Sequence, residues 1–369
     1  MTPNKTDDRS TDVSPDVGRT GAAEAGEAPR RSSLDAMKRT RAHAAANALM
    51  LGTVLLIIIF SLLSDVFLTV QNFRDILVQV SVIAVVAVPT ALLVIAARVD
   101  LSIGSTLALG AVVTGLLITD NTVGVIPAIA AGIAGGAIVG AVNGVLVTVL
   151  GLSPIIVTLG ALTAVRGLSL TVAPDPLFNF SPAFVNLGQG ALLGVPYLVL
   201  IAAAVFLLGA AVLAQMPVGR HIYAIGVNEE AAYLSGVRVK QITLVLFIAT
   251  GAAAGLAGVM LAARIGSAPS GVLGVGFELD VLTAVILGGV AFSGGRGTIT
   301  GVFLGVVFLG ILQNGLTLEN VPTATASMIK GMVLVVAAGL DRIAMRSPNV
   351  PRAPTRSESA SANRETAET

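Results

Sequence analysis

Long uninterrupted runs of apolar residues fill the middle of this sequence and restrict it to one class of fold. A helix needs about 20 mostly apolar residues to cross roughly 30 Å of hydrocarbon, and a helix satisfies its own backbone hydrogen bonds there. The sequence contains ten such runs: 46–64, 76–97, 101–119, 125–149, 154–173, 196–215, 242–263, 279–292, 298–316 and 324–341. The pattern predicts an all-α integral membrane protein of about ten transmembrane helices. The eighth run is short and fits a half-helix that does not cross alone.

The composition agrees with a membrane protein and excludes several kinds of site. Hydrophobic residues make up 54% of the chain and charged residues only 12%, whereas a soluble domain carries roughly 25% charged residues. Cysteine is absent, and neither His43 nor His221 has a second histidine at metal-ligand spacing. The chain has no phosphate-binding G-x-x-x-x-G-K-[ST] loop, and its net charge of +1 argues against nucleic acid as a partner. We therefore expect no bound metal or cofactor and no catalytic residues.

The charge distribution predicts the topology. Residues 1–45 and 342–369 are polar and lack apolar periodicity, which predicts two disordered tails around one membrane domain at 46–341. If the N-terminus is inside, the inner segments hold eighteen of the 22 Lys and Arg residues, and the outer segments hold only Arg74 and Arg264. Cytoplasmic segments are enriched in basic residues. Both tails are therefore predicted to be cytoplasmic.

Glycines at four-residue spacing predict close helix packing. Gly132, Gly136, Gly140 and Gly144 follow one another in the fourth run. Small residues at this spacing let helix backbones approach closely in lipid.

The longest internal connection, residues 216–241, contains the signals of a short helix. Asn228 is a good N-cap, two glutamates follow in the first turn, and Gly236 can end the helix. A short helix in an inner loop suits docking on another protein, although it could also simply join two spans. The residues of this candidate docking helix are Asn228, Glu229, Glu230, Ala231, Ala232, Tyr233 and Gly236.

Several motifs resemble one transporter family. The string Glu230-Ala231-Ala232-x-x-x-Gly236 resembles the E-A-A-x-x-x-G signature of permeases in bacterial ABC importers. The segments VDLSIGS, PIIVTLG and GRHIYAIGVNEEAAYLSGV, together with 274–301, resemble the motifs of the ribose-type (monosaccharide) branch, within the superfamily of branched-chain amino acid and ribose permeases. The resemblance runs from about Asn72 to Asp341. It departs at Ala97, Arg98 and Val99, where the family often has Gly-Gly and an Ile, and an arginine there could pair with Asp100.

The resemblance implies an assembly and a mechanism. It implies a permease in the bacterial plasma membrane that passes a pentose, a hexose or a related small polar solute. Two permease subunits, as a homodimer, would pair around a central pathway. Two ATPase subunits would dock on the short inner helices, and an extracellular or periplasmic binding protein would deliver the solute. ATP-driven closure of the ATPases would then cause alternating access, with no covalent chemistry in this chain.

Polar residues within or beside the apolar runs are the candidates for a translocation path or gate, because such residues usually face protein or water. They are Asp100, Ser102, Asn143, Thr158, Glu278 and Asn314.

Each of these residues also has a structural alternative. Asp100 or Ser102 could cap the third helix, and Glu278 with Asp280 could cap the eighth. The uncharged residues could be interhelical hydrogen-bonding partners. Arg166 and Lys330 are expected to snorkel toward the nearer interface, and residues 288–297 are expected to form a tight cytoplasmic turn.

Two other functions remain alternatives at this stage. A self-contained, ion-coupled secondary transporter would need membrane carboxylates for coupling, and these are scarce here. A membrane-embedded enzyme would need paired catalytic groups within the spans, and the sequence has none.

Overall fold

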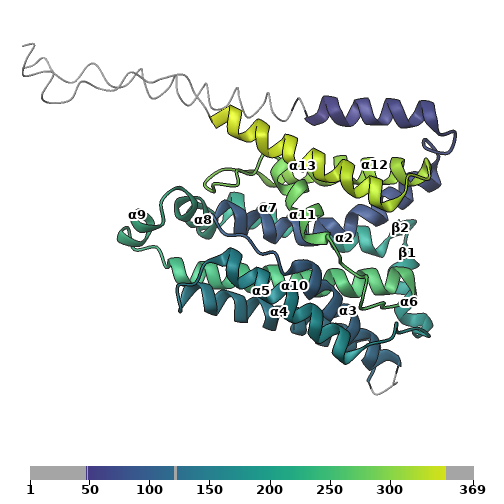
Figure 1. The fold of residues 1–369 in the computed structure, drawn as a ribbon, viewed down its shortest axis with the longest axis horizontal. Coiled ribbons are helices and arrows are strands. Elements are labelled where there is room, and N and C mark those ends of the chain that lie inside the picture. The colour runs from purple at the N-terminus through teal and green to yellow at the C-terminus, as the bar shows by residue number, and fades with distance from the viewer. Residues whose placement is uncertain (1–46, 48, 120–122, 346–369) are drawn as a thin grey trace, which may run out of the picture. The chain divides into compact units, whose positions relative to one another are not determined.

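The computed structural model describes residues 47, 49–119 and 123–345 (Figure 1). The predicted tail 1–45 lies outside the described residues, as does 346–369 of the other tail. Residues 342–345 continue the last helix instead of beginning a tail.

Helices account for nearly all of the described regular structure. In chain order they are Leu49–Leu63, α2 (Val70–Ile95), α3 (Ile103–Thr119), α4 (Val125–Thr148), α5 (Pro154–Val172), α6 (Pro182–Gln189), α7 (Tyr197–Gln215), α8 (Pro217–Val227), α9 (Glu229–Leu234), α10 (Val239–Ile265), α11 (Phe277–Leu287), α12 (Ile299–Leu318) and α13 (Thr323–Met345). Each of the ten predicted runs overlaps one of these helices. The predicted all-α membrane fold is confirmed.

The lengths divide the apolar helices into three groups. Among the described residues, α2, α4, α5, α7, α10 and α12 are long and apolar enough to cross a membrane. The helix Leu49–Leu63, α3 and the Thr323–Gly339 part of α13 are apolar but shorter. With 11 residues, α11 is about 16 Å long at 1.5 Å per residue, too short to cross alone. This agrees with the half-helix expected for the eighth run.

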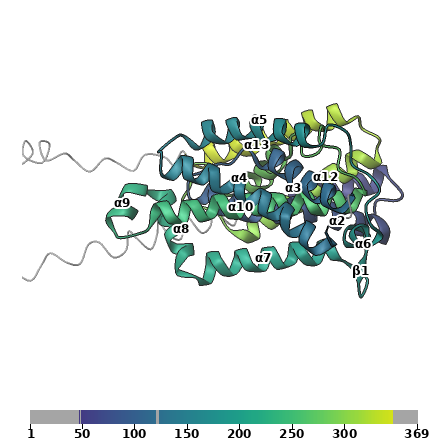
Figure 2. The same cartoon turned by 90° about the horizontal axis from the view of Figure 1, so that it is seen from below.

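The core is built on α10, which packs against α4, α3 and α2; α10 and α4 lie side by side in both views (Figures 1 and 2). The buried positions of α4 include all four glycines of the predicted stripe. A Cβ added at Gly136 would lie 2.9 Å from the Gly255 backbone nitrogen. The prediction of close packing is confirmed, and its partner is α10.

Two helices have boundaries that differ from the predicted ones, because polar residues or glycines interrupt the apolar pattern there. Helix α2 begins at Val70, six residues before the predicted start, because Thr69 caps it by accepting a hydrogen bond from the Asn72 backbone nitrogen. Helix α11 ends at Leu287, before the predicted end at 292, because Gly288 and Gly289 follow and Gly289 has φ +81°.

Three elements were not predicted. Helix α6 and the antiparallel hairpin β1 (Ala191–Leu192) and β2 (Val195–Pro196) occupy the connection between α5 and α7. Helix α8 occupies the first half of the 216–241 connection. Both α6 and α8 begin with proline at the first helical position, a start signal that sequence reasoning passed over.

Candidate functional site

Helix α9 forms where the sequence predicted a short helix. The Asn228 side chain accepts a hydrogen bond from the Ala231 nitrogen at 3.0 Å, and Glu229 and Glu230 occupy the first turn. After the helix, Gly236 has φ +83°, a backbone geometry that favours glycine. The predicted cap, acidic first turn and terminating glycine are all confirmed.

The surface of α9 presents apolar side chains that no other described part of the chain covers. Ala232 is buried, whereas Tyr233 and Leu234 are 68% and 79% exposed. Between α8 and α9 lies a groove of about 380 Å³. Its lining is mostly apolar and includes Tyr223, Val227, Ala231 and Val237. Figure 1 shows α8 and α9 together at one end of the helices, away from α6 and the hairpin.

Helix α8 connects this surface to the turn 288–297 and to the end of α2. The Tyr223 hydroxyl donates to the Gly297 carbonyl at 2.6 Å, and burial raises the pKa of Tyr223, which keeps the hydroxyl protonated as a donor. At Gly226 the α8 backbone contacts the Ile95 carbonyl at the end of α2. The Gly295 nitrogen also donates to Ile95, at 2.8 Å.

The segment 288–297 forms the predicted turn. Gly289, Gly294, Gly295 and Gly297 all have positive φ in the left-handed range. The structure adds that this turn contacts both α8 and the end of α2.

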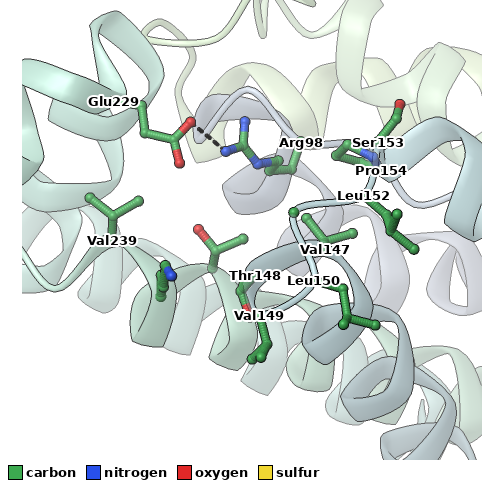
Figure 3. A pocket seen from close by; sticks show the side chains of 13 residues that line it. Arg98, Val147, Thr148, Val149, Leu150, Leu152, Ser153, Pro154, Glu229 and Val239 are labelled. Atoms are coloured by element: carbon green, nitrogen blue, oxygen red, sulfur yellow. Dashed lines mark hydrogen bonds and ion pairs between the residues drawn. The ribbon is translucent and has the colours of Figure 1, made fainter.

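Arg98 does not pair with Asp100, the partner that the sequence left possible. Its Nη2 atom lies 2.6 Å from Oε2 of Glu229, the first residue of α9, and the two side chains point toward one another in Figure 3. They border a cavity of about 450 Å³ whose opposite wall is the connection from Val147 to Pro154. The ion pair therefore joins the end of α2 to α9.

Three of the predicted path residues meet at the start of α3. Asp100 Oδ1 accepts from the backbone nitrogen of Ser102 at 2.8 Å and from its hydroxyl at 2.6 Å. The Ser102 hydroxyl in turn accepts from Asn143 of α4 at 2.9 Å. All three residues are buried. The network holds Ser102, the residue before α3, against α4. Asp100 bonds the Ser102 amide, ahead of the first helical residue Ile103, so a cap on α3 by Asp100 stays a prediction.

Asn314 and Thr158 lie apart from this network. Asn314 of α12 exchanges two side-chain hydrogen bonds, of 3.1 and 2.8 Å, with Asn72 of α2, so it joins two helices as the packing alternative expected. Thr158 instead donates to the Pro154 carbonyl within its own helix.

Glu278, in the first turn of α11, lies against α3. A Cβ added at Gly104, in the first turn of α3, would meet a Glu278 carboxylate oxygen and the Gly274 carbonyl. Glu278 also interacts electrostatically with Arg166 of α5. It is thus the candidate path residue placed where two helix starts meet.

The two cations within the apolar runs have partners among the described residues, and their snorkelling toward an interface stays a prediction. Arg166 donates to the carbonyls of Ser270 and Leu273, at 3.0 and 2.6 Å, which ties the connection before α11 to α5. Lys330 of α13 pairs with Asp280 of α11 at 2.8 Å. A buried cation without a partner would be costly in a membrane.

Comparison with known proteins identifies the family. Residues 72–338 match the family described as "Branched-chain amino acid transport system / permease component". The chain belongs to this permease family. The resemblance found in the sequence motifs is confirmed, and the permease is a multi-pass protein of a bacterial inner membrane.

Curated relatives of the permease cover most of its length. The D-allose transport system permease protein AlsC of Escherichia coli (strain K12) is 36% identical over 79% of this chain and 89% of its own length. The ribose import permease protein RbsC of the same strain is 37% identical over 79% and 92%. The L-arabinose ABC transporter permease protein AraH of Azospirillum brasilense is 38% identical over 75% and 81%. No solved structure matches the permease.

Several residues that organise the permease were left out of the predicted site or were given other roles. They are Asn72, Arg98, Arg166, Tyr223 and Lys330, each joined to an element distant in the sequence. The cations carried a usable signal, because a charged side chain within an apolar run requires a partner. Asn72 and Tyr223 carried no such signal in the sequence, because only the fold brings their partners near.

Proposed function

We propose that the permease is the membrane subunit of an ABC importer and passes a monosaccharide by alternating access driven by partner ATPases. Docking of an ATPase is supported by α9, a separate capped helix at the position of the family motif. Its Tyr233 and Leu234 side chains are exposed beside an apolar groove. The solute class is supported by the relatives, whose names specify allose, ribose and arabinose.

The proposed topology has ten membrane segments, with α11 as a half-helix and both tails cytoplasmic. The excess of Lys and Arg in the inner segments supports this orientation. It places α8, α9 and the turn 288–297 on the cytoplasmic side. The connection 266–276 then re-enters the membrane from the outside and leads into α11, an irregular backbone that is tolerated where protein covers it. The domain organisation, one membrane domain that ends with α13 between two disordered tails, belongs to the same proposal.

The proposed assembly contains two copies of the permease, two ATPase subunits on the α8–α9 surfaces and an external binding protein. The chain itself binds no cofactor in this proposal. The candidate gate is the contact of Glu278 with the first turn of α3 at Gly104, because half-helix starts at mid-membrane are where transporters place solute contacts. Asp100, Ser102 and Asn143 hold the α3 side of this gate in place. Thr158 and Asn314 remain path candidates on sequence grounds only.

Reconstitution tests the proposal against its alternative. Proteoliposomes that contain the permease, its ATPase and its binding protein should take up radiolabelled D-ribose, D-allose or L-arabinose only with ATP, and uptake should survive collapse of ion gradients. Uptake by the permease alone on an ion gradient would instead establish a secondary transporter.

A double substitution tests the docking surface. Gly236→Arg with Glu230→Lys should abolish co-purification of the ATPase, because it adds bulk and reverses a charge on the proposed contact surface. Gly236 has open space around its Cβ position, so the effect does not require an internal clash. Gly266→Arg is the matched control, since Gly266 also follows a helix, has φ +69° and has open space. Unchanged co-purification of the double variant would exclude α9 as the docking helix.

A further inference from the structure

The end of α2 has a defined backbone geometry that fixes the direction of Arg98. The Ala97 nitrogen donates to the Val94 carbonyl at 2.9 Å, and the Arg98 nitrogen donates to the Leu93 carbonyl at 3.0 Å. Ala97 has φ +57°. This pair of bonds around a left-handed residue is the Schellman motif. Arg98 is therefore attached directly to a helix end and not to a loose loop.

The side chain of Arg98 connects this helix end to α9. Its Nη2 atom is 2.6 Å from the Glu229 carboxylate, and its Nη1 atom donates back to the Ala97 carbonyl at 3.3 Å. The Arg98 side chain is 19% exposed and that of Glu229 is 51% exposed. Half-exposed ion pairs contribute little to folding stability. The pair is thus better placed to transmit a displacement than to hold the fold together.

The residues after Arg98 lead directly to the start of α3. Asp100 follows two positions later and is fixed to Ser102, which is fixed to Asn143 of α4. Because all three are buried and bonded, a displacement of Arg98 acts on the α3 start rather than being absorbed by a flexible loop. The first turn of α3 then contacts Glu278 at Gly104.

We propose that Arg98 is a positioning residue that carries movement of α9, through its ion pair with Glu229, to the start of α3 and the Glu278 contact. This rests on the proposed function, in which α9 is the helix displaced by the ATPase. Arg98 is also a position at which this chain departs from the motif that the ribose-type branch often has.

Charge exchange tests the link in the complete importer. The permease is assembled with its ATPase and binding protein in proteoliposomes, and uptake of radiolabelled D-ribose, D-allose or L-arabinose is measured per ATP hydrolysed. Arg98→Glu should lower this ratio by about fivefold or more, the lower range of coupling between linked sites. The exchange Arg98→Glu with Glu229→Arg should restore the ratio to within about twofold of the wild type, because interacting residues compensate one another. The exchanged pair serves as the matched control for Arg98→Glu, because it keeps one positive and one negative charge but swaps their positions.

Assembly and stability are measured alongside coupling. Co-purification of the ATPase and the midpoint of thermal unfolding should stay at wild-type values in Arg98→Glu, which separates transmission from docking and folding. If Arg98→Glu does not fold, Arg98→Gln is used in its place and should also lower the uptake per ATP hydrolysed. A wild-type ratio in an assembled Arg98 variant would overturn the proposal. So would an exchanged pair that still co-purifies with the ATPase and is as impaired as Arg98→Glu. Absence of ATP-dependent uptake by the wild type would overturn the proposed function instead.

Discussion

One methyl group at the centre of the helix packing should measurably destabilise the permease. Gly255 of α10 lies between α3 and α4, where a Cβ would be 2.6 Å from the Gly132 carbonyl oxygen and 3.1 Å from the Ile133 Cα. A Cβ added at Gly110 of α3 would lie only 2.7 Å from the Gly255 Cα on the other side. The obstacles are backbone atoms, which no rotamer change can move away. Gly255→Ala therefore forces the helices apart by several tenths of an ångström.

The expected magnitude follows from two opposing effects. Alanine in place of glycine stabilises a helix interior by about 1 kcal/mol. Overpacking a close interface costs about 1–3 kcal/mol, and the upper part of that range applies because backbone faces backbone. The net loss is about 1–2 kcal/mol, which lowers the unfolding midpoint by about 1–2 °C for each kcal/mol, because the entropy of unfolding grows with chain length.

The assay is thermal unfolding of the purified permease in detergent, with the same substitution at open positions as control. Gly160 of α5 and Gly331 of α13 are helical glycines with nothing within 4 Å of an added Cβ. Gly160→Ala and Gly331→Ala should raise the midpoint or leave it unchanged. A midpoint for Gly255→Ala as high as those of the controls would refute the close approach of α10 to α4.

Two further substitutions test local geometry. Ala97→Gly should stabilise the permease by about 1 kcal/mol, because Ala97 has φ +57° and glycine avoids the cost of that conformation; a lower midpoint of thermal unfolding would contradict the Schellman geometry. Asn72→Leu should lower the free energy of unfolding by about 1–3 kcal/mol, because it leaves buried Asn314 without its side-chain partner. The double variant Asn72→Leu with Asn314→Leu should regain much of the lost stability in thermal unfolding. If the double variant were as destabilised as Asn72→Leu alone, the Asn72–Asn314 pair would be excluded as the cause.

Much of the fold was readable from the sequence because the membrane removes alternatives. A segment in lipid must satisfy its backbone internally, so an apolar run of sufficient length becomes a helix. For this reason each of the ten predicted runs overlaps a helix. The cap and terminating glycine of α9 were equally readable, since Asn228 and Gly236 act on neighbours within a few residues.

Elements outside the apolar runs were harder to predict. Helix α8 and the hairpin between α6 and α7 have no run of sufficient length, and their short sequences fit several conformations. Helix α8 acquires its place from tertiary contacts, namely the Tyr223 bond to Gly297 and the approach of Gly226 to Ile95.

The sequence by itself determined the all-α membrane fold, the helix at α9 and the family, because these depend on local composition, local capping and ordered motifs. Only the tertiary structure decided the partners of the charged and polar residues. Arg98 could have paired with nearby Asp100 but lies against Glu229, while Arg166 bonds two backbone carbonyls and Lys330 pairs with Asp280. A side chain pairs with whatever group the packed helices bring within about 3 Å, and that proximity arises from helix packing rather than from sequence spacing.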